Sequence, residues 1–100
     1  MSVVPVKLGI VGLGRWAKVL ARAAQQTDKL RIVAAYSRSG ERRAAFEKEL
    51  GVPAAPDMRS LLSNPEINGV ILTVPNEQHF PLAEQVARAG KHVYTEKPIA

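Results

Sequence analysis

Short apolar segments alternate along the chain with segments of helical spacing. The apolar segments are VKLGIV (6–11), LRIVAAY (30–36), a brief VPAA (52–55), NGVILTV (68–74) and KHVYTEKP (91–98). Nearly continuous apolar runs such as the first and the fourth are typical of strands that are buried on both faces. Strands that alternate with helices predict an α/β fold, in which a doubly wound parallel sheet is joined by right-handed crossovers.

The segments between these strands carry helical signals. Alanine and arginine, which are good helix formers, are frequent in 15–26. Its apolar residues recur at helical intervals, so we expect one face of this helix to be buried. The residues expected on that face are Trp16, Val19, Leu20, Ala23 and Ala24. In the next segment, Phe46 and Leu50 lie four residues apart and are expected on the inner face of a second helix.

Capping residues indicate where two helices begin and end. Ser39 precedes GERRAAFEKEL (40–50) and is expected to be its N-cap, and Gly51 is expected to end that helix. Asp57 is expected to cap a short helix, MRSLL (58–62), in the same way. Both caps therefore predict helices on the two sides of the brief segment VPAA.

A fourth helix is expected in NEQHFPLAEQVARAG (76–90), after the strand at 68–74. Pro81 has no N–H group to donate, so it is expected in the first turn of that helix. Gly90 is expected to end the helix, because glycine accepts the left-handed conformation at a C-terminus. The strand at 91–98 then closes the pattern.

Composition and charge exclude several classes of protein. The 100 residues suffice for one domain, and 46% of them are hydrophobic, so a core can be buried. The chain has no cysteine, which excludes disulfide scaffolds and thiolate zinc sites, and no metal site is predicted. The formal charge of +5 comes from scattered basic residues, so no nucleic-acid partner is expected. No apolar run approaches the roughly 18 residues of a membrane helix, and with no leader sequence we expect a cytoplasmic protein.

A glycine motif, GLGRWA, lies between the first expected strand and the first helix. Gly12, Gly14 and Ala17 give it the spacing G-x-G-x-x-A. In a β-α-β unit, the first glycine permits a tight turn, the second lets a pyrophosphate approach the backbone, and the third small residue lets helix and strand pack closely. The N–H groups and the dipole of the helix then face the phosphates. The motif predicts a dinucleotide site, and the alternative is a sharp structural turn.

The end of the second strand bears on the choice between NAD and NADP. An acidic residue about 20 positions after the glycine motif usually binds the free ribose 2′-hydroxyl of NAD. Ser37 and Arg38 occupy this region, and no acidic residue lies between Tyr36 and Glu41. A hydroxyl and a guanidinium would bind a 2′-phosphate through charge-assisted hydrogen bonds. NADP is therefore predicted in preference to NAD, and the alternative is that Arg38 is only an exposed loop residue.

Two further motifs follow, TVPNEQH (73–79) and AGKHVYTEKP (89–98). Together with the glycine motif they resemble the Gfo/Idh/MocA family (glucose–fructose oxidoreductase, inositol dehydrogenase and rhizopine catabolism) over essentially the whole chain. The resemblance implies an NAD(P)-dependent oxidoreductase that transfers a hydride between a nicotinamide cofactor and a hydroxyl or carbonyl carbon of a sugar, cyclitol or related polyol. It also implies an amino-terminal Rossmann domain and a carboxy-terminal α/β domain with a large open sheet.

The resemblance also assigns site residues. Those implied under the cofactor phosphates are Gly12, Leu13, Gly14, Arg15 and Trp16, and those implied at the adenosine ribose are Ser37 and Arg38. Those implied beside the cofactor, at and just after the end of the strand at 68–74, are Thr73, Pro75, Asn76 and His79. Those implied near the nicotinamide are Glu96, Lys97 and Pro98. Because ligands bind at the carboxyl ends of strands where the strand order reverses, we expect one crevice to collect these motifs.

Lys97 is the expected catalytic residue. Its ammonium could hydrogen-bond the substrate oxygen and stabilise charge there, and a lowered pKa beside the nicotinamide would let it join a proton relay. The alternative is a surface lysine. Glu96 is expected either to orient Lys97 or to pair with another cation, and Pro98 to hold a cis bond that aims Lys97 inward. His79 either reaches the nicotinamide pocket or only occupies the first turn of its helix with no role in the site. Trp16 either covers the cofactor edge or packs under the loop.

The expected organisation is a partial NAD(P)-binding domain over 1–100, which would still need a helix and a last strand. A substrate domain is expected beyond residue 100, with the acid–base partner residues and the contacts that make a homo-oligomer. The alternative function is a regulatory module that senses NAD(P) without chemistry.

Overall fold

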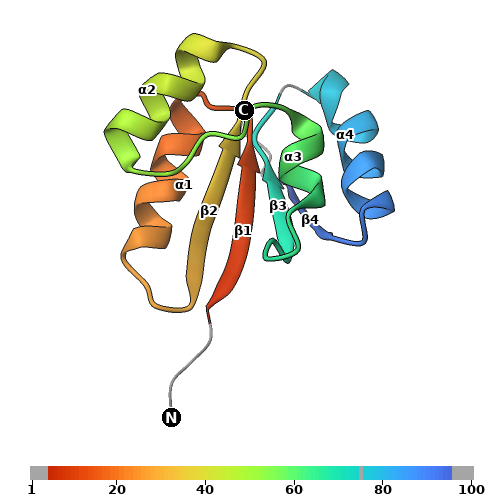
Figure 1. Cartoon of the computed structure of the whole chain (residues 1–100), viewed down its shortest axis with the longest axis horizontal. Helices are drawn as coiled ribbons and strands as arrows, with labels where there is room; N and C mark the ends of the chain where they lie inside the picture. The colour runs from red at the N-terminus through yellow and green to blue at the C-terminus, as the bar shows by residue number, and fades with distance from the viewer. Residues whose placement is uncertain (1–4, 75, 96–100) are drawn as a thin grey trace.

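The computed structural model of the chain describes residues 5–74 and 76–95, and the side chains of 76–79 lie outside this description. The described residues contain a four-stranded sheet in which every neighbouring pair of strands is parallel (Figure 1). Its strands are β1 (Val6–Val11), β2 (Leu30–Tyr36), β3 (Gly69–Leu72) and β4 (His92–Thr95), in the order β2-β1-β3-β4. The chain moves from β1 outward to β2 and then returns to the other side of β1. The predicted parallel α/β fold is therefore confirmed, with the reversal at β1.

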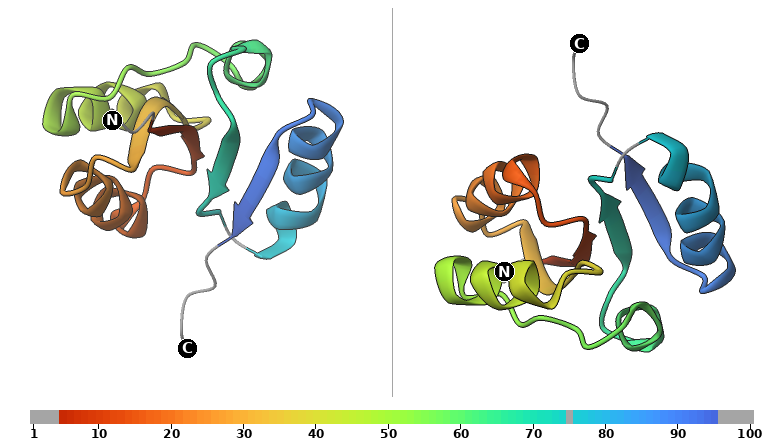
Figure 2. Two further views of the ribbon diagram at one scale, coloured as in Figure 1. Left: turned by 90° about the horizontal axis from the view of Figure 1, so that it is seen from below. Right: turned by 90° about the horizontal axis from the view of Figure 1, so that it is seen from above.

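Within the described residues, four helices cover the two faces of the sheet. They are α1 (Arg15–Gln25), α2 (Gly40–Leu50), α3 (Met58–Ser63) and α4 (Asn76–Arg88). Figure 2 shows α1 and α2 side by side and away from α4. The buried side chains form two clusters, one shared by α1 and α2 and the other by α3 and α4. This is the doubly wound arrangement that the alternation predicted.

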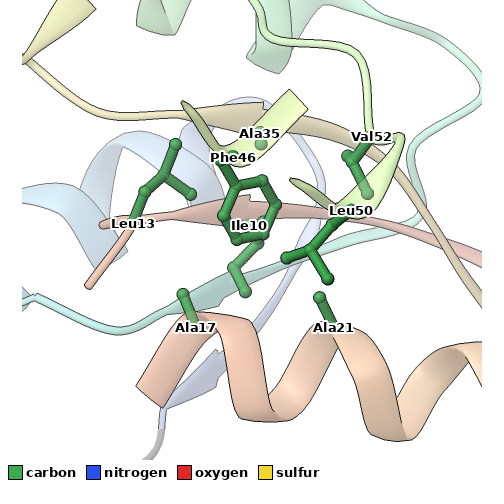
Figure 3. Packing of buried hydrophobic residues seen from close by; sticks show 8 residues of the cluster. All are labelled: Ile10, Leu13, Ala17, Ala21, Ala35, Phe46, Leu50 and Val52. Atoms are coloured by element: carbon green, nitrogen blue, oxygen red, sulfur yellow. The ribbon is translucent and has the colours of Figure 1, made fainter. Parts of the chain in front are cut away.

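The first cluster is built around the ring of Phe46, which is fully buried (Figure 3). Ile10 from β1 and Ala35 from β2 meet it from the sheet, and Leu50 lies one helical turn further along α2. Full burial of one such side chain contributes about 1.5–3 kcal/mol to folding. The prediction that Phe46 and Leu50 form the inner face of α2 is confirmed.

Adjacent residues of one strand pack into clusters on opposite faces of the sheet. Ile10 belongs to the cluster under α1 and α2, whereas Val11 belongs to the cluster under α3 and α4. In β3, Val70 and Leu72 are also completely buried in the second cluster. Successive side chains of a strand point to opposite faces, so a strand covered on both faces needs apolar residues at consecutive positions. This explains the continuous apolar runs in the sequence.

The buried face of α1 agrees only in part with the predicted one. Ala24 is buried as predicted, and Leu20 is partly buried against the first cluster. Trp16 and Val19 are each 48% exposed and Ala23 is exposed, whereas Ala17 and Ala21 are buried instead. Large side chains of α2 already fill the space above the sheet, so α1 contributes small ones to the same cluster. The helix axis therefore lies close to its neighbours, and the larger side chains of Trp16 and Val19 are turned toward solvent.

The predicted N-caps are confirmed. The hydroxyl of Ser39 accepts a 3.2 Å hydrogen bond from the backbone N–H of Arg42, and the carboxylate of Asp57 accepts one of 2.7 Å from Ser60. The hydrogen bond from Ser60 stabilises the carboxylate and holds the pKa of Asp57 below its ordinary value. Gly51 ends α2 with a φ of 69°, as predicted.

The position of Pro81 in α4 and the structure of residues 52–55 differ from the predictions. Pro81 is the sixth residue of α4, beyond the predicted first turn, so the helix lacks one backbone hydrogen bond there. Residues 52–55 form a single bridge, between Ala54 and Ala35, rather than a third strand. Pro53 can accept but not donate a ladder hydrogen bond, which limits pairing at this edge.

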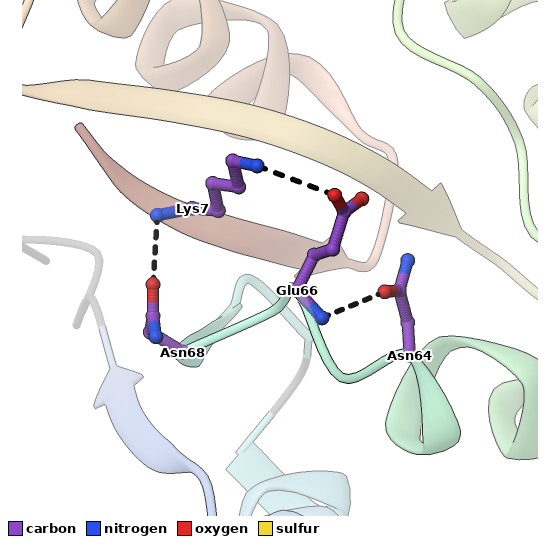
Figure 4. Close-up of polar contacts among 4 residues, drawn as sticks. All are labelled: Lys7, Asn64, Glu66 and Asn68. Atoms are coloured by element: carbon purple, nitrogen blue, oxygen red, sulfur yellow. Dashed lines mark hydrogen bonds and ion pairs between the residues drawn. The ribbon is translucent and has the colours of Figure 1, made fainter. Parts of the chain in front are cut away.

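Polar contacts join the loop before β3 to the start of β1 (Figure 4). The backbone N–H of Lys7 donates to Oδ1 of Asn68 at 3.1 Å, and its ammonium pairs with Glu66 at 3.3 Å. The N–H of Glu66 in turn donates to Oδ1 of Asn64 at 2.9 Å. These contacts hold together the amino-terminal ends of the two central strands, opposite the ends from which the glycine motif departs.

Candidate functional site

A cleft of about 520 Å³ lies at the carboxyl ends of β1, β2 and β3. Six residues named from the sequence line it, from three separate segments of the chain. They are Gly12, Leu13, Gly14, Ser37, Arg38 and Thr73. These six residues therefore share one crevice at the edge where the strand order reverses, and the motif around Lys97 lies outside the described residues.

Gly12 is required by the packing of the protein itself. Its φ is +92°, a conformation that glycine accepts and other residues rarely adopt. A Cβ at this position would lie 2.7 Å from the carbonyl oxygen of Thr73 and 2.8 Å from Cγ1 of Val74. The N–H of Gly12 also donates to the carbonyl of Tyr36 at 2.9 Å, so the turn is attached to the end of β2.

Gly14 faces open space instead. A Cβ there would meet no atom within 4 Å, and the backbone, with φ −86° and ψ −165°, is one that any residue can adopt. The packing of the described residues gives no reason for glycine at this place. A bound group that needs to approach the backbone would supply that reason.

Gly14 is also the N-cap of α1, and this helix start differs from two others. Within the described residues, no side chain caps α1, and its first turn contains no acidic residue. By contrast, side chains of Ser39 and Asp57 cap α2 and α3. The first N–H groups of α1 therefore lack a side-chain acceptor, and together with the helix dipole they favour an anion in the cleft.

Thr73 holds the glycine loop in place. Its N–H donates to the carbonyl of Val11 at 2.9 Å, and its hydroxyl lies 3.1 Å from the same oxygen and in close contact with the carbonyl oxygen of Gly12. The hydroxyl has one proton, so it donates to one of these two oxygens at a time. Thr73 lines the cleft, and its hydroxyl proton is used in a hydrogen bond to the backbone of the glycine loop.

The β2–α2 loop brings positive charge to the cleft. Arg38 is exposed on this loop and Arg42 is exposed in the first turn of α2, and both line the cleft. In the described part of the chain, neither guanidinium forms a hydrogen bond or an ion pair, which leaves both available to an anionic ligand. The sequence reasoning missed Arg42, although its place one turn after Arg38 and just after the Ser39 cap could have indicated it.

The opposite wall of the cleft is largely apolar and was not predicted. It is formed by Met58 at the start of α3, by Val74 after β3, and by Leu82 and Gln85 on α4. The spacing of the last two, three residues apart on one helix, places both on the same face. An apolar wall beside cationic and backbone donors suits a ligand with a flat, weakly polar part and an anionic part.

The remaining predicted residues have different placements. Leu13 is only 4% exposed and packs in the first core cluster, so it supports the loop. Arg15 lines a second hollow of about 460 Å³, which adjoins the cleft at Gly14 and Arg42. Trp16 is half-exposed on α1, and whether it covers the cofactor edge or packs under the loop stays a prediction.

Several predicted residues lie outside the described part of the structure. Asn76 and His79 belong to the first turn of α4, but their side chains are not described. The other predicted residues that lie outside are Pro75, Glu96, Lys97 and Pro98. Their roles, including the cis bond at Pro98 and the catalytic role of Lys97, stay predictions.

A larger hollow of about 640 Å³ lies elsewhere, between α1, the start of β2 and the segment after α2. It has neither a glycine loop nor an uncapped helix start, and in open α/β sheets ligands bind at the other ends of the strands. Among the described residues, no three histidine, aspartate or glutamate side chains gather as metal ligands would. Within the same residues, no helix combines the length and apolar character needed to cross a bilayer.

Comparison with known proteins identifies the domain. Residues 6–100 match the family model for the Gfo/Idh/MocA oxidoreductases, described as an oxidoreductase family with an NAD-binding Rossmann fold. The curated relatives that were matched first are three to four times longer, so the chain spans about 25–29% of their length. One of them, 1,5-anhydro-D-fructose reductase of Ensifer adhaerens, is 31% identical over 92% of this chain and 28% of its own.

Three solved structures are also similar. A Desulfitobacterium hafniense protein proposed to be an NADPH-dependent oxidoreductase is 44% identical, with a TM-score of 0.90 over 96% of this chain and 28% of its own. A scyllo-inositol dehydrogenase of Lactobacillus casei is 34% identical, with a TM-score of 0.85 over 100% and 30%. A biliverdin reductase of Synechocystis, solved with biliverdin and NADP+, is 33% identical, with a TM-score of 0.86 over 96% and 30%. The chain belongs to the Gfo/Idh/MocA oxidoreductase family and carries its NAD-binding Rossmann fold.

Proposed function

We propose that the cleft binds a nicotinamide dinucleotide, with its pyrophosphate at the start of α1. The observation that carries this proposal is the open space at Gly14, beside N–H groups that no side chain of the described residues caps. A backbone free of a Cβ lets phosphate oxygens approach the N–H groups, and the helix dipole stabilises their charge. The residues present therefore fit this cofactor, and the apolar wall with Met58 and Leu82 suits its adenine.

We further propose that the protein prefers NADP to NAD. Ser37, Arg38 and Arg42 offer a hydroxyl and two guanidinium groups to a 2′-phosphate at the end of β2, where an acidic residue would repel it. One charge-assisted hydrogen bond contributes about 1.5–3 kcal/mol, which corresponds to about tenfold to a hundredfold in affinity. The NADPH dependence proposed for the D. hafniense relative is in line with this preference.

We propose an oxidoreductase that acts on a hydroxyl or carbonyl carbon of a sugar, cyclitol or related polyol. When bound, the nicotinamide supplies or accepts the hydride. Lys97 is proposed to hydrogen-bond the substrate oxygen through its ammonium and to stabilise charge there, with Glu96 and Pro98 nearby. The 1,5-anhydro-D-fructose reductase and the scyllo-inositol dehydrogenase support this substrate class, whereas the biliverdin reductase indicates that related domains serve other substrates.

The substrate site itself is proposed to lie in a second domain. We propose that residues 1–100 form the cofactor domain, and that the acid–base partners of Lys97 and the contacts of a homo-oligomer lie outside it. A cytoplasmic location belongs to the same proposal. The relatives' greater length supports the assignment of cofactor and substrate to different parts of the protein.

The first test of cofactor binding uses Trp16, the only tryptophan of the chain. It follows the proposed phosphate site by two residues and is 48% exposed. We would titrate the intact protein and its Trp16→Phe variant with NADPH and then with NADH, and assign to Trp16 the energy transfer to the reduced nicotinamide that the variant lacks. Saturation at a clearly lower NADPH concentration is expected. Saturation first with NADH would overturn the NADP preference, and no transfer from the folded protein would overturn the dinucleotide site.

The role of Lys97 is tested separately by turnover. Lys97→Met in the intact protein is expected to abolish reduction of its carbonyl substrate while the affinity for NADPH stays unchanged. Lys29→Met is the matched control, because Lys29 is exposed at the far end of the sheet. Full turnover by Lys97→Met would refute the catalytic role. If the intact wild type binds NADPH but turns over no substrate in a broad screen of sugars and polyols, the alternative function would be favoured, a regulatory module that senses NAD(P) without chemistry.

A further inference from the structure

Arg43, which does not line the cleft, attaches α2 to the end of β2. Its guanidinium lies over the ring of Tyr36, 5.5 Å from the ring centre, at a distance typical of a cation–π contact. The same group donates a 2.7 Å hydrogen bond from Nη1 to the carbonyl oxygen of Ser37. Both partners immediately precede Arg38, and Arg43 is half-buried. One side chain therefore holds two consecutive residues at the point where the strand becomes the loop.

The loop continues this set of contacts as far as Arg42. The hydroxyl of Ser37 accepts a hydrogen bond of 3.3 Å from the N–H of Ser39, and the hydroxyl of Ser39 accepts one of 3.2 Å from the N–H of Arg42. Arg38 lies inside this series and has no side-chain partner of its own among the described residues. The backbone is thus held on both sides of Arg38. Arg43 holds the two residues before it, and the serine hydroxyls hold the residues after it.

The position of Gly40 is consistent with a defined place for the guanidinium. A Cβ on Gly40 would lie 3.3 Å from Nη2 of Arg43, which is closer than an ordinary van der Waals contact. The first residue of α2 therefore leaves room for the planar group to lie between Tyr36 and the loop. A planar guanidinium can stack and donate at the same time, whereas a lysine ammonium is a point charge on a flexible stem.

We infer that Arg43 is a positioning residue that makes the cleft selective for a ribose 2′-phosphate. It holds the loop 37–39 so that Arg38 and Arg42 face the same cleft, and it does so without contacting the ligand. The inference deepens the proposed function and rests on it. Because the adenosine half of the dinucleotide carries the 2′-phosphate, the effect is expected on every 2′-phosphorylated adenosine ligand and on no other.

The experiment measures the affinity of the intact protein for adenosine 2′,5′-bisphosphate and for 5′-AMP by calorimetry. The variants are Arg43→Gln and Arg43→Lys. The first removes both the charge and the guanidinium group, whereas the second keeps the charge and the methylene stem and removes only the guanidinium group. Arg31→Gln is the matched control, because Arg31 is exposed near the start of β2, remote from the cleft, and its loss changes the net charge equally.

Both Arg43 variants are expected to bind the bisphosphate about tenfold more weakly, the effect of one misplaced charge-assisted hydrogen bond, and to bind 5′-AMP within about twofold of the wild type. The control is expected to match the wild type with both ligands. The conservative lysine variant is expected to fold like the wild type, which circular dichroism would check.

Four results would overturn the inference, and each is distinct. Wild-type affinity for the bisphosphate in Arg43→Lys would mean that Arg43 acts through its charge alone. Equal losses for both ligands would mean a merely structural role. A wild-type protein that binds both ligands equally would overturn the proposed NADP preference with the inference, and binding of neither would overturn the dinucleotide site itself.

Discussion

Gly12 and Gly14 lie two residues apart in one loop, yet the structure gives them opposite reasons to be glycine. The same substitution, to alanine, adds one methyl group at each position. Gly12→Ala is expected to damage the fold, because its Cβ would meet the backbone carbonyl oxygen of Thr73, just after β3, at 2.7 Å. Gly14→Ala is expected to spare the fold and damage ligand binding, because its Cβ would meet no protein atom within 4 Å.

The cost at Gly12 has two parts. A residue with a Cβ pays about 1–2 kcal/mol for the left-handed backbone, and forced overlap with packed neighbours adds about 1–3 kcal/mol. The two together, about 2–5 kcal/mol, are a large part of the 5–15 kcal/mol that stabilises a typical domain. In a domain of this size the melting temperature should fall by roughly 10–30 °C.

The cost at Gly14 falls on binding. Its φ of −86° suits alanine, so the stability should change by no more than about 0.5 kcal/mol, as for other surface substitutions. The added methyl group would lie where a phosphate must approach the helix start. We expect the affinity for NADPH to fall at least about tenfold, which is the contribution of one charge-assisted hydrogen bond.

Two assays on the same samples separate the effects: thermal melting followed by circular dichroism, and titration of NADPH followed by energy transfer from Trp16. A Gly12→Ala protein that melts like the wild type would refute the packing argument. A Gly14→Ala protein that binds NADPH like the wild type would show that the open space is not where the phosphates lie. Each substitution serves as the control for the other.

Two further predictions concern stability. Lys91→Met removes an ammonium that donates two 2.8 Å hydrogen bonds to backbone carbonyls before β3, and it should lower the free energy of unfolding in urea by about 1 kcal/mol, with Lys29→Met unchanged. Glu49 has a pKa held below its ordinary 4.5, first by the hydrogen bond from Lys18 at 2.8 Å and then by the charges of Lys18 and Arg22. Because the pKa of Glu49 is depressed in the folded state, its ion pairs with Lys18 and Arg22 stabilise the fold above pH 4.5. This stabilisation is lost as the pH falls through the folded-state pKa. Glu49→Gln should therefore be less stable than the wild type at pH 7, and a difference that persists unchanged at pH 2 would contradict this.

Most of the fold could be predicted because local sequence patterns determine it. Consecutive apolar positions such as Ile10 and Val11 require a strand covered on both faces, and a serine before a helical segment predicts its first turn. The buried side of α1 was not predictable in this way. Trp16 and Ala17 begin two stripes of the same helical spacing, and the choice between them depends on Phe46, which reaches the same space from another helix.

The site was predictable where one short segment forms it and not where distant segments meet. The glycine motif carries its own geometry, so Gly12 and Gly14 could be placed in the cleft from the sequence. Leu82 and Gln85 could not, because their place in the cleft depends on how α4 returns across the sheet. In the sequence, Arg43 is one of several scattered basic residues, and only its contacts with the end of β2 distinguish it from the others.

The central place of β1 has a consequence for synthesis of the protein. Leu8 pairs with Ile32 of β2, 24 residues later, and with Gly69 of β3, 61 residues later. Closing the longer loop costs about 0.8 kcal/mol more in chain entropy. A nascent chain can thus complete the first β-α-β unit while one edge of β1 has no partner on the chain yet. An unpaired apolar edge is a template for pairing with another molecule. A ribosome that stalls before residue 69 would release a product prone to aggregate, whereas a stall after residue 72 would not leave this edge open.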